Sequence, residues 1–371
     1  MSETQERPRP GRLTIYVGAA PGVGKTYKML QDAHVVKNQG FDVVIGWLDT
    51  HGRRETAEQV GDLERIPPKL VVYQGRTFQE MDLAAILRRH PQIALVDELA
   101  HTNVPEPGAH AKRYEDIEDL LAAGIDVVTT VNIQHLESLY DKVAHITGVA
   151  VRERVPDQFL RRAREIKLVD ASPETLQERL RQGKIYAMDK VDAALNHFFQ
   201  LGKLAALREL ALVEVANRVE PPLNTVVEAT QGGQREKILV CVSGGPQSES
   251  LIRRGWRIAD RLQAELTVLL IRSTSSPAEP ELNETVLTRI RQLSAQFGAA
   301  LIVRDAPKHL IGTTIVSVAE ELKVSQIVIG QPPPRPGRWG LRRSSPVDVV
   351  LARAEFVDLH VVGRVTHPHD T

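Results

Sequence analysis

A glycine-rich segment near the N-terminus has the residue types that bind phosphate. Residues 19–26 read AAPGVGKT, the apolar run LTIYV precedes them, and a helical pattern follows. In this context main-chain N–H groups can surround a phosphate, Lys25 can neutralise its oxygens, and the Thr26 hydroxyl can ligate Mg²⁺. A purely structural glycine turn is the alternative. The spacing favours a cradle that takes ATP with Mg²⁺.

This segment departs from the usual P-loop at its first position. Ala19 stands where the first glycine is expected, and Gly18 precedes it by one residue. The residues predicted to contact the nucleotide are Gly18, Ala19, Ala20, Pro21, Gly22, Val23, Gly24, Lys25, Thr26 and Asn132.

A second apolar run ends in two acids, as the metal-binding strand of a nucleotide site should. The run IALV is followed by Asp97 and Glu98. We expect Asp97 to share the magnesium ion with Thr26, and Glu98 to polarise a water or an acceptor hydroxyl. Taken alone, the pattern would equally suit a solvated strand end, but the phosphate cradle makes the metal-binding interpretation stronger.

Polar residues follow two of the predicted strands. His101, in the loop after Glu98, is a second candidate for a catalytic base, with a loop-capping histidine as the alternative. Metal binding by His101 and His110 is less favoured. Asn132, with Gln134 and His135, ends the next strand and could sense the γ-phosphate, or could simply complete the strand end by hydrogen bonding.

Two arginines, Arg53 and Arg54, follow another strand near the expected nucleotide edge. Either could act as a charge-stabilising finger, although a solvated helix start is the more common role for such a pair.

The elements that must position these residues alternate between short β-branched runs and helical patterns. Such an alternation predicts a doubly wound α/β fold with a mostly parallel sheet. Its predicted buried strands cover residues 12–18, 42–49, 69–74, 92–98 and 126–132.

A helical connector is predicted to follow this domain. Short strands are expected at 151–156 and 165–170, and a helix is expected to start at Ser172 with Pro173 in its first turn. Residues 188–219 form a long amphipathic helical pattern with a predicted break near Gly202.

A second α/β domain is predicted from a second alternating series with about four helices. Its predicted strands cover residues 237–243, 265–272, 300–305, 326–330 and 358–363. The domain bounds predicted from these patterns are 12–220 and 235–365, with a linker at 221–234 that is rich in proline and glycine.

The composition limits the partners of this chain. Its 371 residues carry 47 Lys and Arg against 47 Asp and Glu, which argues against nucleic acid as the main partner. The single cysteine excludes an intramolecular disulfide. The N-terminus has no signal-peptide core, and no apolar stretch approaches the ~18 residues of a membrane span. We therefore expect a cytoplasmic chain, with a homodimer left open.

Four segments in order resemble the N-terminal sensor region of the KdpD family. They are GAAPGVGKTYKML, GWLDTHGRRET, LVDELAHTNVPEPGAH and TTVNIQHLESLYD, and the resemblance spans about residues 12 to 220. The part from residue 235 onward resembles the universal-stress-protein module that follows in that family. The resemblance implies an ATP-binding input that tunes a membrane histidine kinase controlling potassium-transporter expression.

The expected partners are therefore the nucleotide and sensor-kinase or potassium-transport components. This sequence has no membrane block and no histidine-kinase core, so we expect a short form or the input region of a longer sensor. Because that core is missing, we do not expect this chain to share the family's phosphorylation on histidine.

A basic loop marks the second domain. Arg335, Arg338, Arg342 and Arg343 precede Ser344 and Ser345 at a helix start, where guanidinium groups and helix N–H donors could bind an anion. Since the usual ATP glycines are absent there and some relatives bind cyclic di-AMP, the predicted ligand is cyclic di-AMP or an acidic partner surface. A solvated arginine loop is the alternative.

Three functions remain compatible with these residues. The favoured one is a regulatory ATP- and Mg²⁺-binding module, with slow hydrolysis as a reset. The others are a phosphotransferase acting on a protein serine, with Glu98 or His101 as base, and a nucleotide-sensing scaffold that does not hydrolyse ATP. The sequence does not separate a switch from a kinase, because both need the same cradle.

Overall fold

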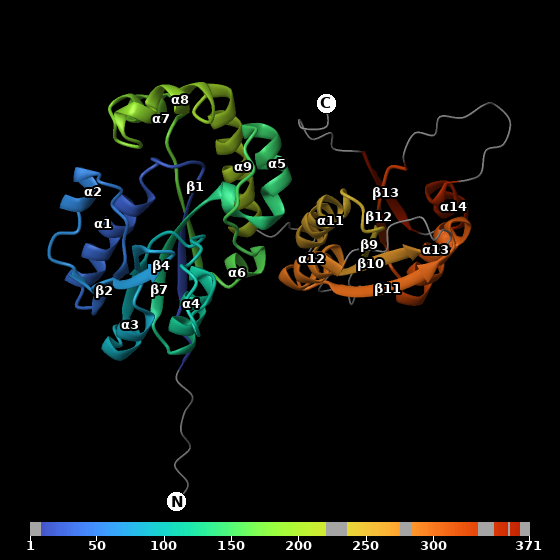
Figure 1. Ribbon diagram of the computed structural model, residues 1–371, viewed down its shortest axis with the longest axis horizontal. Coiled ribbons are helices and arrows are strands. Elements are labelled where there is room, and N and C mark those ends of the chain that lie inside the picture. Colours follow the sequence, from blue (N-terminus) through green and yellow to red (C-terminus); the bar gives the residue numbers. More distant parts are fainter. Residues whose placement is uncertain (1–8, 220–235, 275–283, 333–344, 355–356, 364–371) are drawn as a thin grey trace, which may run out of the picture. The chain divides into compact units, whose positions relative to one another are not determined.

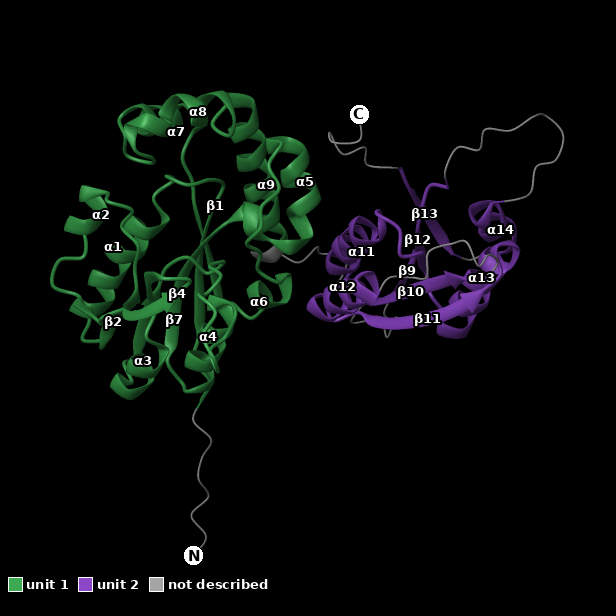
Figure 2. Cartoon of the chain, viewed as in Figure 1, with its two compact units in different colours: residues 1–219 green, residues 220–371 purple. Residues whose placement is uncertain are grey.

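The computed structural model describes residues 9–219, 236–274, 284–332, 345–354 and 357–363. The chain divides into two compact units, residues 1–219 and 220–371 (Figure 2). Each unit contains a parallel sheet with packed helices, so the predicted α/β fold class is confirmed for both (Figure 1). The predicted linker at 221–234 lies outside the described residues, and the domain bounds stay predictions.

The first unit is built on a six-stranded sheet in which every pair of neighbouring strands is parallel. In spatial order its strands are β3 (Glu64–Arg65), β2 (Val43–Trp47), β6 (Ile93–Val96), β7 (Asp126–Asn132), β1 (Leu13–Gly18) and β8 (Glu165–Val169). All carboxyl ends of these strands therefore lie along one edge, where open α/β sheets bind their ligands.

Helices cover both faces of this sheet because its strands alternate their side chains between two cores. Ile15 and Val17 of β1 pack into one apolar cluster, and Tyr16 packs into the other. The Tyr16 side is covered by α1 (Lys25–Asn38). The opposite side is covered by α3 (Leu83–Arg89), α4 (Arg113–Ala122), α5 (Tyr140–Thr147), α6 (Asp157–Arg161) and α9 (Leu201–Val219). Short helices complete the unit at α2 (Arg54–Glu58), η1 (Ile133–His135) and η2 (Glu137–Leu139).

The predicted helical connector packs on the glycine-rich loop itself. It consists of α7 (Pro173–Arg181), η3 (Met188–Lys190), α8 (Val191–Asn196) and α9. As predicted, Ser172 caps α7, and its hydroxyl accepts from the Thr175 N–H. The break predicted near Gly202 is confirmed: α8 ends at Asn196, α9 begins at Leu201, and the chain turns at His197, which has φ −115° and ψ −86°.

Two strand predictions in the first unit are wrong. Residues 69–74 were expected in the parallel sheet, but β4 (Lys69–Tyr73) instead forms an antiparallel hairpin with β5 (Arg76–Glu80). Of its apolar residues, Leu70 and Val72 remain exposed, and the β-branched run alone could not reveal this. Residues 151–156 form no strand and contribute one isolated bridge, between Val155 and Leu136.

The second unit contains a five-stranded parallel sheet, and all five predicted strands are present. In spatial order they are β11 (Ala300–Ala306), β10 (Glu265–Ser273), β9 (Lys237–Val242), β12 (Gln326–Gly330) and β13 (Asp358–Val362). The helices described in this unit are α11 (Ser248–Leu262), α12 (Glu284–Gln296), η4 (Lys308–Leu310), α13 (Ile311–Leu322) and α14 (Pro346–Arg353).

The basic loop of the second unit lies mostly outside the described residues. The residues of this loop that are not described include Arg335, Arg338, Arg342, Arg343 and Ser344. Ser345 is described, and its side chain caps α14 by accepting from the Asp348 N–H at 3.2 Å. The cyclic di-AMP site therefore stays a prediction.

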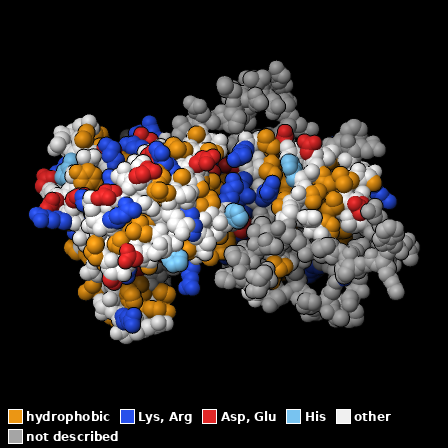
Figure 3. Space-filling model, turned by 90° about the horizontal axis from the view of Figure 1, so that it is seen from above, with side chains coloured by type: hydrophobic (Ala, Val, Ile, Leu, Met, Phe, Trp, Pro, Cys, Tyr) orange, Lys and Arg blue, Asp and Glu red, His pale blue; other side chains and the backbone are white. Residues whose placement is uncertain are grey.

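One face of the first unit agrees with the balanced composition. Over the first unit, on the left of Figure 3, basic and acidic side chains are interspersed on the face shown. None of the helices in the described ranges combines the length and apolar character that crossing a bilayer requires.

Candidate nucleotide-binding site

The glycine-rich loop between β1 and α1 has the backbone of a tight turn. Gly22 and Gly24 have φ of 88° and 104°, a region that residues with a Cβ avoid. A Cβ at Gly22 would also lie 2.2 Å from Cδ1 of Ile185. Gly24 is the N-cap of α1, so Lys25 is its first residue, with 8% of its surface exposed.

Strand register brings the predicted residues together. Gly18 of β1 pairs with Asn132 of β7, so Asn132 lies beside the loop, and its Oδ1 accepts a hydrogen bond from Lys25 Nζ. Asp97 follows β6, and its Oδ2 accepts from the Thr26 hydroxyl at 3.0 Å. Its other oxygen accepts from the Thr130 hydroxyl of β7. Two phosphate-loop residues are thus bonded to two neighbouring strand ends.

A cavity of about 130 Å³ opens at this edge of the sheet. Ligand pockets typically measure about 300–1,000 Å³, so this space suits phosphate groups better than a whole nucleotide. Its lining residues are Pro21, Gly22, Lys25, Thr26, His51, Arg53, Asp97, Glu98, Ala100, His101, Thr130, Val131, Asn132, His135 and Glu153.

Other predicted contact residues lie elsewhere. Ala20 and Val23 are buried in an apolar cluster with Leu176 and Ile185 of the connector. Ala19, in place of the first glycine, is buried in the main core of the unit. These residues shape the loop and are not part of the cavity lining.

Burial makes the central charges of this site costly. It lowers the pKa of Lys25 to about 8; the Asp97 charge opposes that shift, and the Arg53 charge adds to it. Burial likewise raises the pKa of Asp97, against hydrogen bonds from Thr130 and Thr26. A phosphate beside Lys25 and a cation beside Asp97 would each favour the charged form of that side chain. The site is therefore electrostatically suited to an anion and a cation together.

Thr26 and Asp97 form a donor set that fits Mg²⁺. Both offer oxygen atoms, which this hard cation prefers, and their oxygens lie 3.0 Å apart beside the glycine-rich loop.

His135 also lines this cavity. Its Nδ1 is 2.9 Å from the Glu153 carbonyl oxygen, and burial lowers the pKa of its imidazole.

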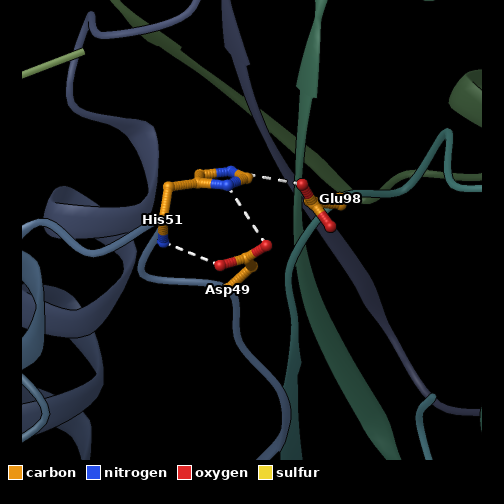
Figure 4. A group of neighbouring side chains, drawn as sticks. All are labelled: Asp49, His51 and Glu98. Carbon is orange, nitrogen blue, oxygen red and sulfur yellow. Dashed lines mark hydrogen bonds and ion pairs between the residues drawn. The ribbon is translucent and has the colours of Figure 1, made fainter. Parts of the chain in front are cut away.

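Glu98 has a different environment from Asp97. Figure 4 shows the His51 imidazole facing the carboxylates of both Asp49 and Glu98. His51 Nδ1 lies 3.1 Å from Asp49, and Nε2 lies 3.3 Å from Glu98. The ligand atoms of the three residues lie within 4.8 Å of one another, a spacing that a metal ion could bridge. A metal would have to displace the proton of His51, because the two carboxylates raise its pKa to about 9.

His51→Gln should alter the pH dependence of stability. A raised histidine pKa stabilises the fold fully below the unfolded value of 6.5, and the gain is lost as pH rises through about 9. The difference in free energy of unfolding between wild type and variant should therefore be largest near pH 6 and vanish above about pH 9. Since the His51 side chain is 44% exposed, we expect at most about 1 kcal/mol.

Urea unfolding of both proteins across this pH range measures the difference, and contributions from Lys25 and other groups cancel in it. A constant difference at all pH values would show that the His51 charge does not stabilise the fold.

Glu98 is also paired with a buried ion-pair network centred on Arg113. Arg113 at the start of α4 is fully buried and donates to Glu80 at 3.2 Å and to the Asp97 main-chain oxygen at 3.4 Å. Its Nη1 lies 3.6 Å from Glu98. His101 Nε2 lies 3.1 Å from Glu80, so His101 is tied to this network while also lining the cavity.

Several of these residues are absent from the predicted site. Thr130, Arg113, Glu80, Asp49 and His51 were not predicted as site residues, and three of their contacts join residues that are 33 or more positions apart in the chain. Asp49 and His51 lie within the segment GWLDTHGRRET, and Thr130 lies within TTVNIQHLESLYD, which was the available signal for these three. His110, considered as a metal ligand with His101, pairs with Asp119 instead.

The two arginines considered as charge-stabilising residues, Arg53 and Arg54, lie in different environments. Arg53 lines the cavity, whereas the side chain of Arg54 is 90% exposed and pairs with Glu58 at 2.6 Å.

Comparison with known proteins places this site in a family. Residues 9–219 match the KdpD family, described as "Osmosensitive K+ channel His kinase sensor domain", and residues 234–362 match the universal stress protein family.

Relatives of two lengths resemble the chain. A protein named as a KdpD sensor in Synechocystis sp. is 47% identical over 359 residues, covering 95% of this chain and 94% of the relative. Sensor protein KdpD of Mycobacterium tuberculosis H37Rv is 42% identical, covering 96% of this chain and 41% of the relative. That of Escherichia coli K12 is 39% identical, covering 92% and 38%. The chain thus spans about two fifths of the length of the latter two.

The family match covers more than half of the chain, and a relative of matching length shares nearly half of its residues; the chain therefore belongs to the KdpD sensor family, with a universal-stress-protein domain following the sensor domain.

Proposed function

We propose that this chain is an ATP- and Mg²⁺-binding regulatory input module of potassium-responsive two-component signalling. One observation carries the proposal. The phosphate-loop residues Lys25 and Thr26 are hydrogen-bonded to Asn132 and Asp97, polar residues at the ends of two neighbouring strands. Membership of the KdpD family supports the signalling role. The proposed location is the cytoplasm, and the proposed partners are sensor-kinase or potassium-transport components, with a homodimer as a further option.

The chain's own residues would bind the phosphates in a defined way. Main-chain N–H groups of the loop and the N-terminus of α1 donate to the phosphate oxygens, and Lys25 neutralises them from its buried position. Thr26 and Asp97 would hold a magnesium ion, which would supply positive charge to neutralise phosphate oxygens.

Nucleotide binding would be sensed through direct packing of the connector on the loop. Arg179 of α7 donates to the Gly22 carbonyl at 2.8 Å and to the Val23 carbonyl at 3.3 Å. Val23 is buried with Leu176 and Ile185 of the connector. Any shift of the loop around a phosphate must therefore move or strain the connector, which is how the binding signal would leave the site.

The surroundings of Glu98 favour a switch over an efficient phosphotransferase. Burial alone would raise its pKa, but the charges of His51 and Arg113 hold the pKa below its ordinary value. A carboxylate that pairs with two cations is a weak base. We therefore propose that hydrolysis, where it occurs, is slow, and that phosphoryl transfer to a protein serine through Glu98 or His101 is the less favoured function.

Incubation with γ-labelled ATP tests this function, with two variants that separate metal binding from turnover. Wild type should bind Mg²⁺-ATP and release labelled phosphate slowly, without labelling protein. Asp97→Asn should weaken Mg²⁺-dependent binding by about tenfold or more, because the metal loses a charged ligand. Glu98→Gln should retain binding within about threefold and lower the release rate.

Labelled protein with an acid-stable phosphoserine would favour the phosphotransferase. Tight binding without any release would identify a nucleotide sensor that does not hydrolyse ATP. Absence of binding by wild type would disprove the proposed function.

A further inference from the structure

Arg53 carries a half-buried guanidinium at this cavity, and one of its N–H donors is unpaired. It lines the cavity with Lys25 and Asp97. Its Nη2 donates to the Ile185 carbonyl at 3.4 Å, at the long end of the hydrogen-bond range. Its Nε is buried and, within the part of the chain that the structure describes, has no hydrogen-bond partner. A guanidinium offers five N–H donors, and buried donors are normally paired.

The charges around the cavity indicate what would pair with Arg53. Its pKa is lowered by burial, against the charges of Asp97, Tyr186, Asp49 and Glu98. Asp97 is already bonded to Thr26 and Thr130, Asp49 is paired with His51, and Glu98 is paired with His51 and Arg113. No carboxylate of the described residues bonds to the Arg53 Nε donor, and phosphate oxygens match a guanidinium well.

Arg53 also links the cavity to the connector. Ile185, whose carbonyl it contacts, packs its side chain against Gly22 of the phosphate loop. The neighbouring Lys184 pairs with Glu55, two residues after Arg53, at 2.7 Å. The segment that holds Arg53 thus contacts the connector at two adjacent residues, and one of these touches the phosphate loop.

We propose that Arg53 binds the terminal phosphate of a nucleoside triphosphate and exchanges its contact with the Ile185 carbonyl for that phosphate. Arg53 would then distinguish the triphosphate from the diphosphate, and would report the difference to residues 182–187. This inference rests on the proposed function and deepens it. Lys25, on the phosphate loop, would bind both nucleotides.

Calorimetric titration of the full chain with Mg²⁺-ATP and Mg²⁺-ADP tests the proposal. Arg53→Ala should lose about tenfold or more in ATP affinity, the effect of removing a charge-assisted hydrogen bond, and less than about threefold in ADP affinity. Arg53→Lys keeps the charge without the planar fork and should lie between. Arg54→Ala is the matched control, because that exposed side chain should leave both affinities unchanged.

Hydrogen exchange at saturating nucleotide gives a second measurement, which a change in affinity alone would not affect. In wild type, saturating ATP and saturating ADP should protect residues 182–187 to different extents, and Arg53→Ala should remove this difference. Both Arg53 variants must first show the wild-type circular dichroism spectrum and melting temperature. If Arg53→Ala does not fold, the Arg53→Lys titration decides.

Equal losses of ATP and ADP affinity, or no loss of either, would overturn the proposal for Arg53 while leaving the nucleotide site in place. Failure of wild type to bind either nucleotide would overturn the proposed function as well. The two failures are therefore distinguishable.

Discussion

Lys25→Ala should remove nearly all affinity for Mg²⁺-ATP. Lys25 is 8% exposed, and the one described hydrogen-bond acceptor of its ammonium is Asn132, so a bound phosphate would gain a largely desolvated partner. Losing such a charge-assisted contact costs about 2–4 kcal/mol, a factor of about 30 to 1,000 in the dissociation constant. Calorimetry at low salt measures this, where the weak residual affinity remains detectable.

Two matched variants distinguish the effect of the Lys25 charge from the effects of its aliphatic stem and of a neighbouring lysine. Lys25→Met keeps most of the buried stem and should lose as much affinity as Lys25→Ala. Lys28→Ala removes an exposed lysine of the same helix, paired with Asp32 at 2.9 Å, and should bind ATP as wild type does. Wild-type affinity in Lys25→Met would contradict the assignment of the phosphate site.

Arg113→Ala should cause the largest loss of stability. Its side chain is fully buried, and it pairs with Glu80, which is 3% exposed. Its guanidinium also lies 4.5 Å from the Trp47 ring centroid. Removing one partner leaves a buried charge uncompensated, which costs about 3–5 kcal/mol. At about 2–4 °C per kcal/mol for a domain of this size, the melting temperature of the first unit should fall by roughly 6–20 °C.

Differential scanning calorimetry of the full chain measures this loss, with two comparisons. Arg113→Met with Glu80→Gln removes both charges and should recover part of the lost stability. Arg162→Ala breaks the exposed pair with Glu118 and should cost less than about 1 kcal/mol. A melting temperature within about 3 °C of wild type for Arg113→Ala would mean that the buried pair contributes little.

Local sequence signals predicted the elements that are buried on both faces. Strands such as β1 and β6 are mainly apolar and buried along nearly their whole length, as a parallel strand between two helical layers requires. The same signal was misleading for residues 69–74. A β-branched run records a preference for extended backbone, but its partner strand and its burial depend on where the chain turns next, here into β5.

The break in the connector was predicted close to its true place, between α8 and α9. Gly202 itself is the second residue of α9, because glycine lowers helix propensity by only about 1 kcal/mol, a cost that packing can outweigh. The turn lies at His197, just before Phe198 and Phe199 pack with each other and Phe199 enters the connector core.

The sequence by itself determined the glycine-rich loop, because eight consecutive residues encode its backbone conformations and the helix start after it. It likewise placed Asp97, Glu98 and Asn132 at the ends of strands, where a parallel sheet gathers them. The tertiary structure alone decided which carboxylate is bonded to hydroxyl groups and which is paired with cations. Asp97 meets Thr26 and Thr130, whereas Glu98 meets His51 and Arg113. These partners come from separate segments, and electrostatic environment depends on distance in space, which spacing along the chain does not encode.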